Sequence, residues 1–113
     1  MSGPPVDDTA FAELQESAGA DFVQELVDTF LEEAPRMLDE LREAAANGRA
    51  DAFRRAAHSL KSNANTFGAL GLGVLARELE LNGVPEGGAD RALATLADEY
   101  ARVAARLQEL RGV

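Results

Sequence analysis

The stretch ADRALATLADEYARVAARLQEL, residues 89–110, decides the fold class of this chain. Its apolar residues recur in alternating steps of four and three, at Ala89, Leu93, Leu96, Tyr100, Val103, Leu107 and Leu110. This spacing places them along one side of a helix, with the period at which helices pack at shallow angles in a bundle. A coiled-coil dimer seam is the alternative, but the other amphipathic segments of the chain offer this stripe an internal partner. We therefore expect a monomer.

Four more segments carry helical signals, at about residues 8–17, 21–47, 52–67 and 72–79. In the longest of them, Asp21 is expected to cap the start of the helix, and Asn47–Gly48 is a typical helix end. The loop NGVPEGG, residues 82–88, precedes the last helix. Because short loops join long amphipathic helices, we predict an all-α fold: an antiparallel four-helix bundle with a short additional N-terminal helix.

Length and composition predict a single domain. The chain has 113 residues and is 46% hydrophobic, which is enough for one core. We expect the bundle to occupy residues 8–113. Residues 1–7 are expected to form a flexible leader, because Pro4 and Pro5 disfavour helix there.

The charge and the missing residue types exclude several classes of function. Acidic residues outnumber basic ones by 20 to 11, so the formal charge is −9 and the surface repels nucleic acid and anionic lipid. There is no cysteine, which excludes disulfides and thiolate metal sites. No apolar run reaches the ~18 residues of a membrane span, and the start MSGPPVDD is not a secretion signal. We expect a cytoplasmic protein that binds neither nucleic acid nor membranes.

The chain has one histidine, His58, in the segment AHSLKSNANTFGA, residues 57–69. On a helical wheel the apolar residues around it share one arc: Phe53, Ala56, Ala57, Leu60, Ala64 and Phe67. His58 lies about 150° from the centre of this arc, so it is not a core residue. An ordinary solvated histidine on the helix surface remains an open interpretation.

Cationic and polar side chains surround this histidine on the predicted helix, namely Arg54, Arg55, Lys61, Ser62 and Asn65. In so acidic a chain, the three cations would form a positive patch that stabilises an anion held at the ring, and the serine and asparagine can add hydrogen bonds. A neutral imidazole is nucleophilic at neutral pH, and phosphoryl transfer depends mainly on positioning and charge neutralisation. His58 is therefore a candidate phosphoryl acceptor. A solvated cationic helix face is the alternative for its neighbours.

The segment AHSLKSNANTFGALGLGVLARELE, residues 57–80, resembles the signature of histidine-containing phosphotransfer (HPt) domains of bacterial phosphorelays. The shared pattern is a small residue, histidine, any residue, a hydrophobe and lysine. Small or polar residues follow, then a glycine ten positions after the histidine and an amphipathic helix that ends in LE. The residues that match are His58, Leu60, Lys61, Gly68, Leu79 and Glu80.

The resemblance implies that His58 accepts a phosphoryl group at Nε2 from the aspartyl phosphate of a response-regulator receiver domain. The group would then pass to an aspartate of another receiver domain. Lys61 would neutralise phosphoryl charge, and Gly68 would let the end of its helix approach a neighbouring helix closely. The magnesium ion of such transfers belongs to the receiver domain, so we expect no metal site and no cofactor in this chain. A hybrid histidine kinase is a further candidate partner.

Three other functions compete with phosphotransfer. An autophosphorylating kinase needs a nucleotide-binding domain, for which five helical segments in 113 residues leave no room. GALGLG, residues 68–73, is not a phosphate-binding loop, because it follows a helix rather than a strand. One histidine and no cysteine disfavour a metalloprotein. A helical binding module that docks receiver domains or kinases without being phosphorylated remains the alternative to a phosphoryl carrier without ATP-binding activity.

Overall fold

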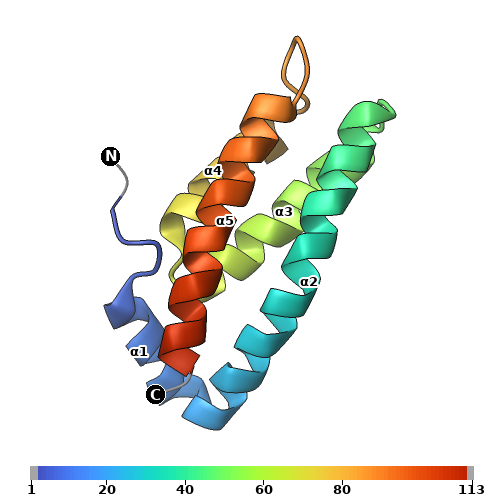
Figure 1. The fold of residues 1–113 in the computed structure, drawn as a ribbon. Coiled ribbons are helices and arrows are strands. Elements are labelled where there is room, and N and C mark those ends of the chain that lie inside the picture. Colours follow the sequence, from blue (N-terminus) through green and yellow to red (C-terminus); the bar gives the residue numbers. More distant parts are fainter. Residues whose placement is uncertain (1–2, 112–113) are drawn as a thin grey trace.

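The computed structural model describes residues 3–111, and all its regular structure is helical (Figure 1). The helices are α1 (Asp8–Ala18), α2 (Ala20–Ala46), α3 (Ala50–Thr66), α4 (Leu70–Asn82) and α5 (Asp90–Arg111). No strand occurs in the described part of the chain. The prediction of an all-α fold with a short additional N-terminal helix is confirmed.

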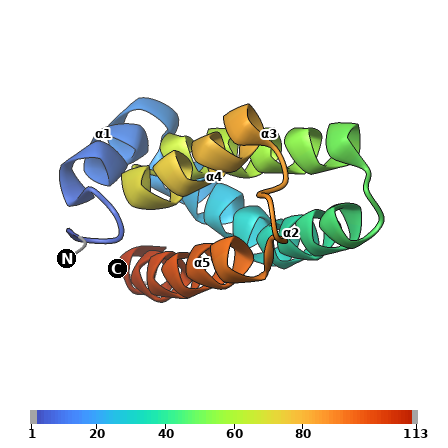
Figure 2. The same cartoon turned by 90° about the horizontal axis from the view of Figure 1, so that it is seen from above.

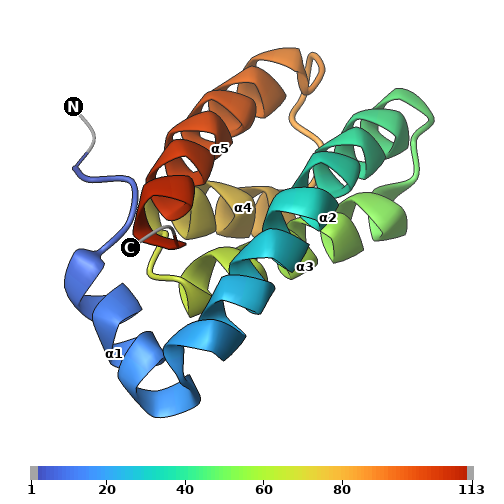
Figure 3. The same ribbon diagram turned by 60° about the horizontal axis from the view of Figure 1, so that its bottom comes forward.

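The four long helices run up, down, up and down in an antiparallel bundle (Figures 1 and 2). α3 packs between α2 and α4, and α5 closes the bundle against α2 and α4, so α3 and α5 lie diagonally opposite without contact. α1 packs against α2 at the end of the bundle where α2 begins and α5 ends (Figure 3). One long side of α3 is consequently left exposed to solvent.

The core is entirely apolar. Its largest members are four fully buried phenylalanines contributed by α1, α2, α3 and the residue after α3: Phe11, Phe30, Phe53 and Phe67. The rings of Phe30 and Phe67 have centroids 5.4 Å apart, and Tyr100 meets Phe30 edge-on at 5.9 Å. No polar or charged side chain among the described residues is buried. Any site that depends on charge must therefore lie on the surface of the bundle.

α1 and α2 begin with different kinds of cap, and the start of α2 differs from the predicted one. Asp7 caps α1, because its Oδ1 accepts hydrogen bonds from the N–H groups of Thr9 at 3.0 Å and Ala10 at 3.3 Å. The prediction that Asp21 caps α2 is wrong. α2 begins one residue earlier, after Gly19, whose φ of 95° suits glycine and which has no side chain to cap with. Asp21 lies inside the first turn, where its negative charge interacts favourably with the positive end of the helix dipole.

α2 continues through Pro35, which cannot donate a hydrogen bond to the carbonyl of Leu31. The hydroxyl of Tyr100 on α5 reaches this carbonyl and donates to it over 3.5 Å. Burial raises the pKa of Tyr100, which keeps its hydroxyl protonated as a donor. A side chain 65 positions further along the chain thus partners the backbone group that the proline leaves free.

The segment before α1 is packed against the bundle. Met1 and Ser2 of the predicted flexible leader lie outside the described residues. Val6 is 1% exposed and belongs to the core, and the N–H of Asp7 donates to the carbonyl of Gly68 at 2.9 Å. Arg102 on α5 donates to the carbonyl of Gly3 at 2.8 Å. The buried part of the domain therefore begins at Val6, two residues before the predicted boundary.

Gly68, just past the end of α3, is the residue on which this N-terminal segment packs. Its φ is +79°, and a Cβ there would lie 3.0 Å from Ala10 Cβ and 3.2 Å from the carbonyl oxygen of Asp7. A side chain at position 68 would thus be strained in its backbone and crowded by two neighbours.

We predict that Gly68→Ala lowers the free energy of unfolding by at least about 2 kcal/mol, because a backbone penalty and a steric penalty combine. Gly48→Ala is the matched control, since Gly48 also has a positive φ, +68°, but has no atom within 4 Å of a Cβ. The control should lose about 1 kcal/mol. Urea denaturation measures both variants, and equal losses would contradict the proposed contact with α1.

Candidate functional site

His58 lies in the middle of α3, on the side of the helix that faces solvent and α4. Its side chain is 58% exposed, whereas Ala57 and Leu60 beside it are fully buried. The structure therefore places the ring outside the core, as the helical wheel predicts. A second molecule can reach the ring without any rearrangement of the bundle.

A carboxylate from α4 holds the ring on its inner side. Glu80 Oε2 lies 2.7 Å from His58 Nδ1, and the other carboxylate oxygen, Oε1, lies 2.7 Å from Lys61 Nζ. The Glu80 and Lys61 side chains are only 17% and 23% exposed. His58, Lys61 and Glu80 thus form one cluster, the His58 cluster, in which Glu80 bridges two residues of α3.

The ionisation state of Glu80 determines which nitrogen of the His58 ring carries the proton and which keeps its lone pair. Hydrogen bonds first from Lys61 and then from His58 lower the pKa of Glu80 below its ordinary value of 4.5, against a smaller opposing effect of desolvation. Glu80 is therefore ionised at neutral pH and can only accept hydrogen bonds. In the neutral ring, Nδ1 must then carry the proton, and Nε2 keeps its lone pair. The contact with Glu80 leaves the outward nitrogen, Nε2, with a free lone pair.

α4 approaches α3 closely at Gly73. A Cβ at this position would overlap Oδ1 of Asn65 on α3, so a larger residue would require the Asn65 amide to move aside. Gly73 is buried in this contact. The amide of Asn65, a candidate for binding an oxyanion, is thus placed against α4, about 10 Å along α3 from His58 at 1.5 Å per residue. The same antiparallel packing of the two helices brings Glu80 to His58.

The three cations predicted to gather at His58 do not all do so. Lys61 belongs to the His58 cluster through its ion pair with Glu80. Arg54 instead forms an ion pair with Asp51, 3.5 Å away in the preceding turn. Arg55, one turn before His58, lines a groove towards α2 with Met37 and Glu40. The positive charge placed in the His58 cluster is therefore that of Lys61.

Ser62 and Gly68 complete the predicted set. Ser62 lies one turn after His58 on the exposed side of α3, where its small side chain leaves the approach to the ring open. Gly68 is ten residues from His58, about 15 Å along the helix axis. The neighbour that it allows to approach is the N-terminal segment with α1, so its part is structural.

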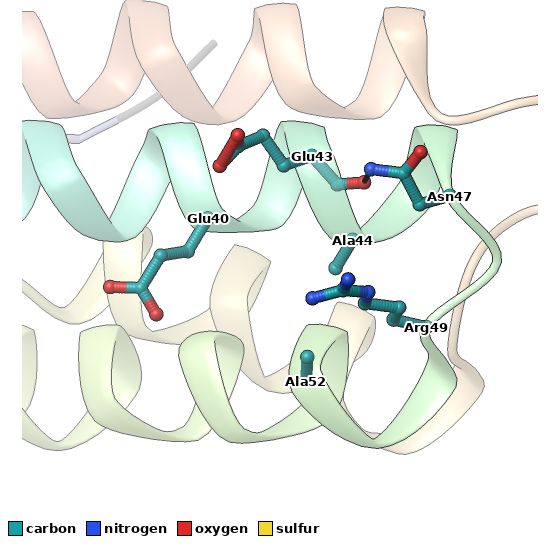
Figure 4. A pocket seen from close by; sticks show the side chains of 6 residues that line it. All are labelled: Glu40, Glu43, Ala44, Asn47, Arg49 and Ala52. Carbon is teal, nitrogen blue, oxygen red and sulfur yellow. Dashed lines mark hydrogen bonds between the residues drawn. The ribbon is translucent and has the colours of Figure 1, made fainter.

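A groove between the end of α2 and the start of α3 has no part in this cluster (Figure 4). It holds about 220 Å³ and is lined by Glu40, Glu43, Ala44, Asn47, Arg49 and Ala52. None of these residues belongs to the His58 cluster. Within residues 3–111, no group of three or more His, Asp or Glu side chains is arranged to hold a metal ion. The candidate site is thus an exposed ring on the surface of α3, suited to reaction with another protein.

Comparison with known proteins identifies the family. The Hpt domain model matches residues 25–112, so the chain belongs to the Hpt domain family, the histidine phosphotransfer domains of phosphorelays. Members of this family carry phosphoryl groups and are not kinases.

One solved structure extends the similarity to nearly the whole chain. The crystal structure of histidine-containing phosphotransfer protein B (HptB) from Pseudomonas aeruginosa PAO1 is 32% identical to this chain, with a TM-score of 0.84. The match covers 98% of this chain and 97% of that one. A comparison with curated proteins gave no match. None of the helices within residues 3–111 has the length and apolar character needed to cross a membrane.

Glu80 is the functional residue that reasoning from the sequence missed. It matches the last letter of the family signature, yet the sequence assigns it no task. A signal was present, because an antiparallel α4 that follows α3 after a short turn must return past His58. Which residue of α4 would meet the ring depended on a register that the sequence does not display.

We predict that Glu80 sets the tautomer of His58. In the unaltered protein, the neutral ring should carry its proton on Nδ1. Glu80→Gln should move the proton to Nε2, because Lys61 can only donate and takes the amide oxygen, so that the amide NH₂ donates to Nδ1, whereas Glu80→Leu should lose any preference. The ¹⁵N chemical shifts of the imidazole distinguish the two forms. A neutral ring protonated on Nε2 in the unaltered protein would contradict the role of Glu80.

Proposed function

We propose that His58 is the phosphoryl-carrying residue of this chain. Its Nε2 attacks the phosphorus of an aspartyl phosphate on a response-regulator receiver domain. The P–N bond forms while the P–O bond to the aspartate breaks, and the aspartate leaves as a carboxylate. The reverse sequence delivers the group to an aspartate of a second receiver domain. The observation that carries the proposal is the 2.7 Å contact of Glu80 with Nδ1 of a ring that is 58% exposed.

Glu80 supports this reaction by compensating charge. When Nε2 uses its lone pair to bond phosphorus, the ring becomes more positive and the proton on Nδ1 more acidic. The ionised carboxylate at Nδ1 stabilises that proton in place, in the way that a buried carboxylate orients a catalytic histidine elsewhere. Transfer in either direction then requires no proton to enter or leave through Nε2.

Lys61 supplies the positive charge. A phosphoryl group brings about −1.5 to −2 charges to the ring at pH 7, next to the carboxylate of Glu80. Lys61 Nζ already lies 2.7 Å from that carboxylate, and its flexible stem lets it share its hydrogen bonds with phosphoryl oxygens. The phosphorylated state is thereby protected from the repulsion of two neighbouring anions.

The partner must be a protein that brings its own reacting groups. Receiver domains fit, because they present an aspartate and its magnesium ion to an exposed ring. The chain then needs no cofactor of its own. The small side chain of Ser62 leaves the approach open. A hybrid histidine kinase that ends in a receiver domain is one class of donor.

We predict that His58→Gln abolishes phosphorylation and leaves the fold intact, because one exposed polar side chain replaces another. The test incubates the protein with labelled, phosphorylated receiver domains from its source and follows the label. The bond should be labile to acid and stable to alkali, as expected of a phosphoramidate. Label that persists on the Gln variant would overturn the assignment, and a parent chain that binds these receivers without labelling would favour the unphosphorylated binding module.

We predict that Lys61→Ala slows transfer or shortens the lifetime of the phosphorylated form without abolishing it, since charge neutralisation is lost but the nucleophile remains. Arg54→Ala is the matched control, because it removes another cation of α3 that pairs with Asp51 instead of Glu80. Transfer rates and the decay of label measure both variants. If the two variants transfer and lose label at the same rates, Lys61 has no special part in the site.

A further inference from the structure

The outer face of α4 carries three large exposed apolar side chains. The large hydrophobic side chains that are exposed among the described residues are Phe22 on α2 and three on α4, Leu70, Val74 and Leu81. The three on α4 are 55–64% exposed. Together with Arg77 they follow one another in steps of four, three and four, which places all of them on one side of the helix. We call these four residues the α4 stripe.

Nothing within the described chain covers the α4 stripe. α4 packs only against α3 and α5, through its buried residues Leu72, Gly73, Ala76 and Leu79. The stripe lies on the opposite side of the helix. The largest apolar patch of a monomer is often part of a surface that binds another protein.

The α4 stripe borders the His58 cluster. Leu81 directly follows Glu80, and Arg77 lies one turn before it, while Glu80 itself is 2.7 Å from the ring of His58. A standard protein interface covers about 800 Å² per partner, which corresponds to a disc of radius ~16 Å. The stripe is about 16 Å long at 1.5 Å per residue. A partner centred on His58 would therefore cover most of it.

The size and charge of the stripe indicate which partner it fits. Its three apolar side chains expose on the order of 300 Å², which is well below the ~800 Å² per partner that a stable interface buries. The stripe alone is thus too small for a dimer of this chain, but it suits one edge of a surface shared with α3. Arg77 forms no ion pair within residues 3–111, unlike Lys61 and Arg54, so its charge is available to an acidic partner.

We propose that the α4 stripe is part of the surface that binds the receiver domain. Val74 and Leu81 bury apolar area against it, and Arg77 meets carboxylates beside its phosphorylated aspartate. This inference rests on the proposed phosphotransfer at His58 and extends it, because it assigns the orientation of the partner. The receiver domain covers α4 as well as α3, and its position over the ring is fixed from the α4 side.

The experiment measures transfer from a phosphorylated receiver domain that labels the parent chain, over a range of concentrations of this protein. Val74→Glu and Arg77→Glu should each raise the half-saturating concentration about tenfold, the size expected for a well-packed interface residue, and leave the rate at saturation unchanged. Ala105→Glu is the matched control for Val74→Glu, because it adds the same charge to the exposed side of α5, which does not pack against α3. It should transfer like the parent. Labelling by phosphoramidate, a small donor that needs no docking surface, should be the same in all four proteins.

Unchanged half-saturation in both α4 variants would overturn the proposal while leaving phosphorylation of His58 in place. A parent chain that sediments as a dimer, with Val74→Glu monomeric and transferring normally, would assign the stripe to a second copy and also overturn it. If no receiver domain labels the parent at all, the proposed function fails first, and the assignment of the stripe fails with it.

Discussion

The packing of α4 directly against α3 is the constraint on which the rest of the site depends. Gly73 leaves the space that the amide of Asn65 fills, so the two helices lie close together at this level. Seven residues later on α4, the same antiparallel packing brings Glu80 within 2.7 Å of both His58 and Lys61. Hydrogen bonds weaken steeply beyond about 3.2 Å, so these contacts depend on the close packing of the two helices. The exposed ring of His58 is thus oriented by a residue of the neighbouring helix.

The residues that stabilise the bundle are different from those of the His58 cluster. Its core is apolar throughout residues 3–111, with four phenylalanines at its centre, whereas the His58 cluster lies on the surface of rigid helices. A reacting ring on a helix is held more precisely than one on a loop. The phosphoryl exchange proposed for this ring therefore leaves the buried residues undisturbed. The same arrangement leaves the surface around His58, including the outer face of α4, to decide which partner approaches and from which side.

Local irregularities of the chain are compensated by residues distant in sequence. Pro35 frees the carbonyl of Leu31, and Tyr100 of α5 donates to it. The carbonyl of Gly68, beyond the end of α3, accepts the N–H of Asp7, which also caps α1. A buried backbone group without a partner is costly, so such contacts bind α1 and α5 to the central helices. They also hold Val6, which follows Pro4 and Pro5 in the segment before α1, in the core.

The sequence by itself determined the number and order of the helices and the exposure of His58, because the 3.6-residue period is a local property of the chain. Helix ends were less accessible: a glycine with positive φ starts α2 in place of the predicted cap at Asp21. The pair of Arg54 with Asp51 is also local, because residues three apart on one helix are neighbours. Only the tertiary structure decided the partners that lie on other helices. Arg55 lines the groove beside α2, and Glu80, 22 residues from His58, became the partner of the ring. Side chains on two helices meet according to the axial register of those helices, which depends on how their buried faces pack and not on a local pattern of the sequence.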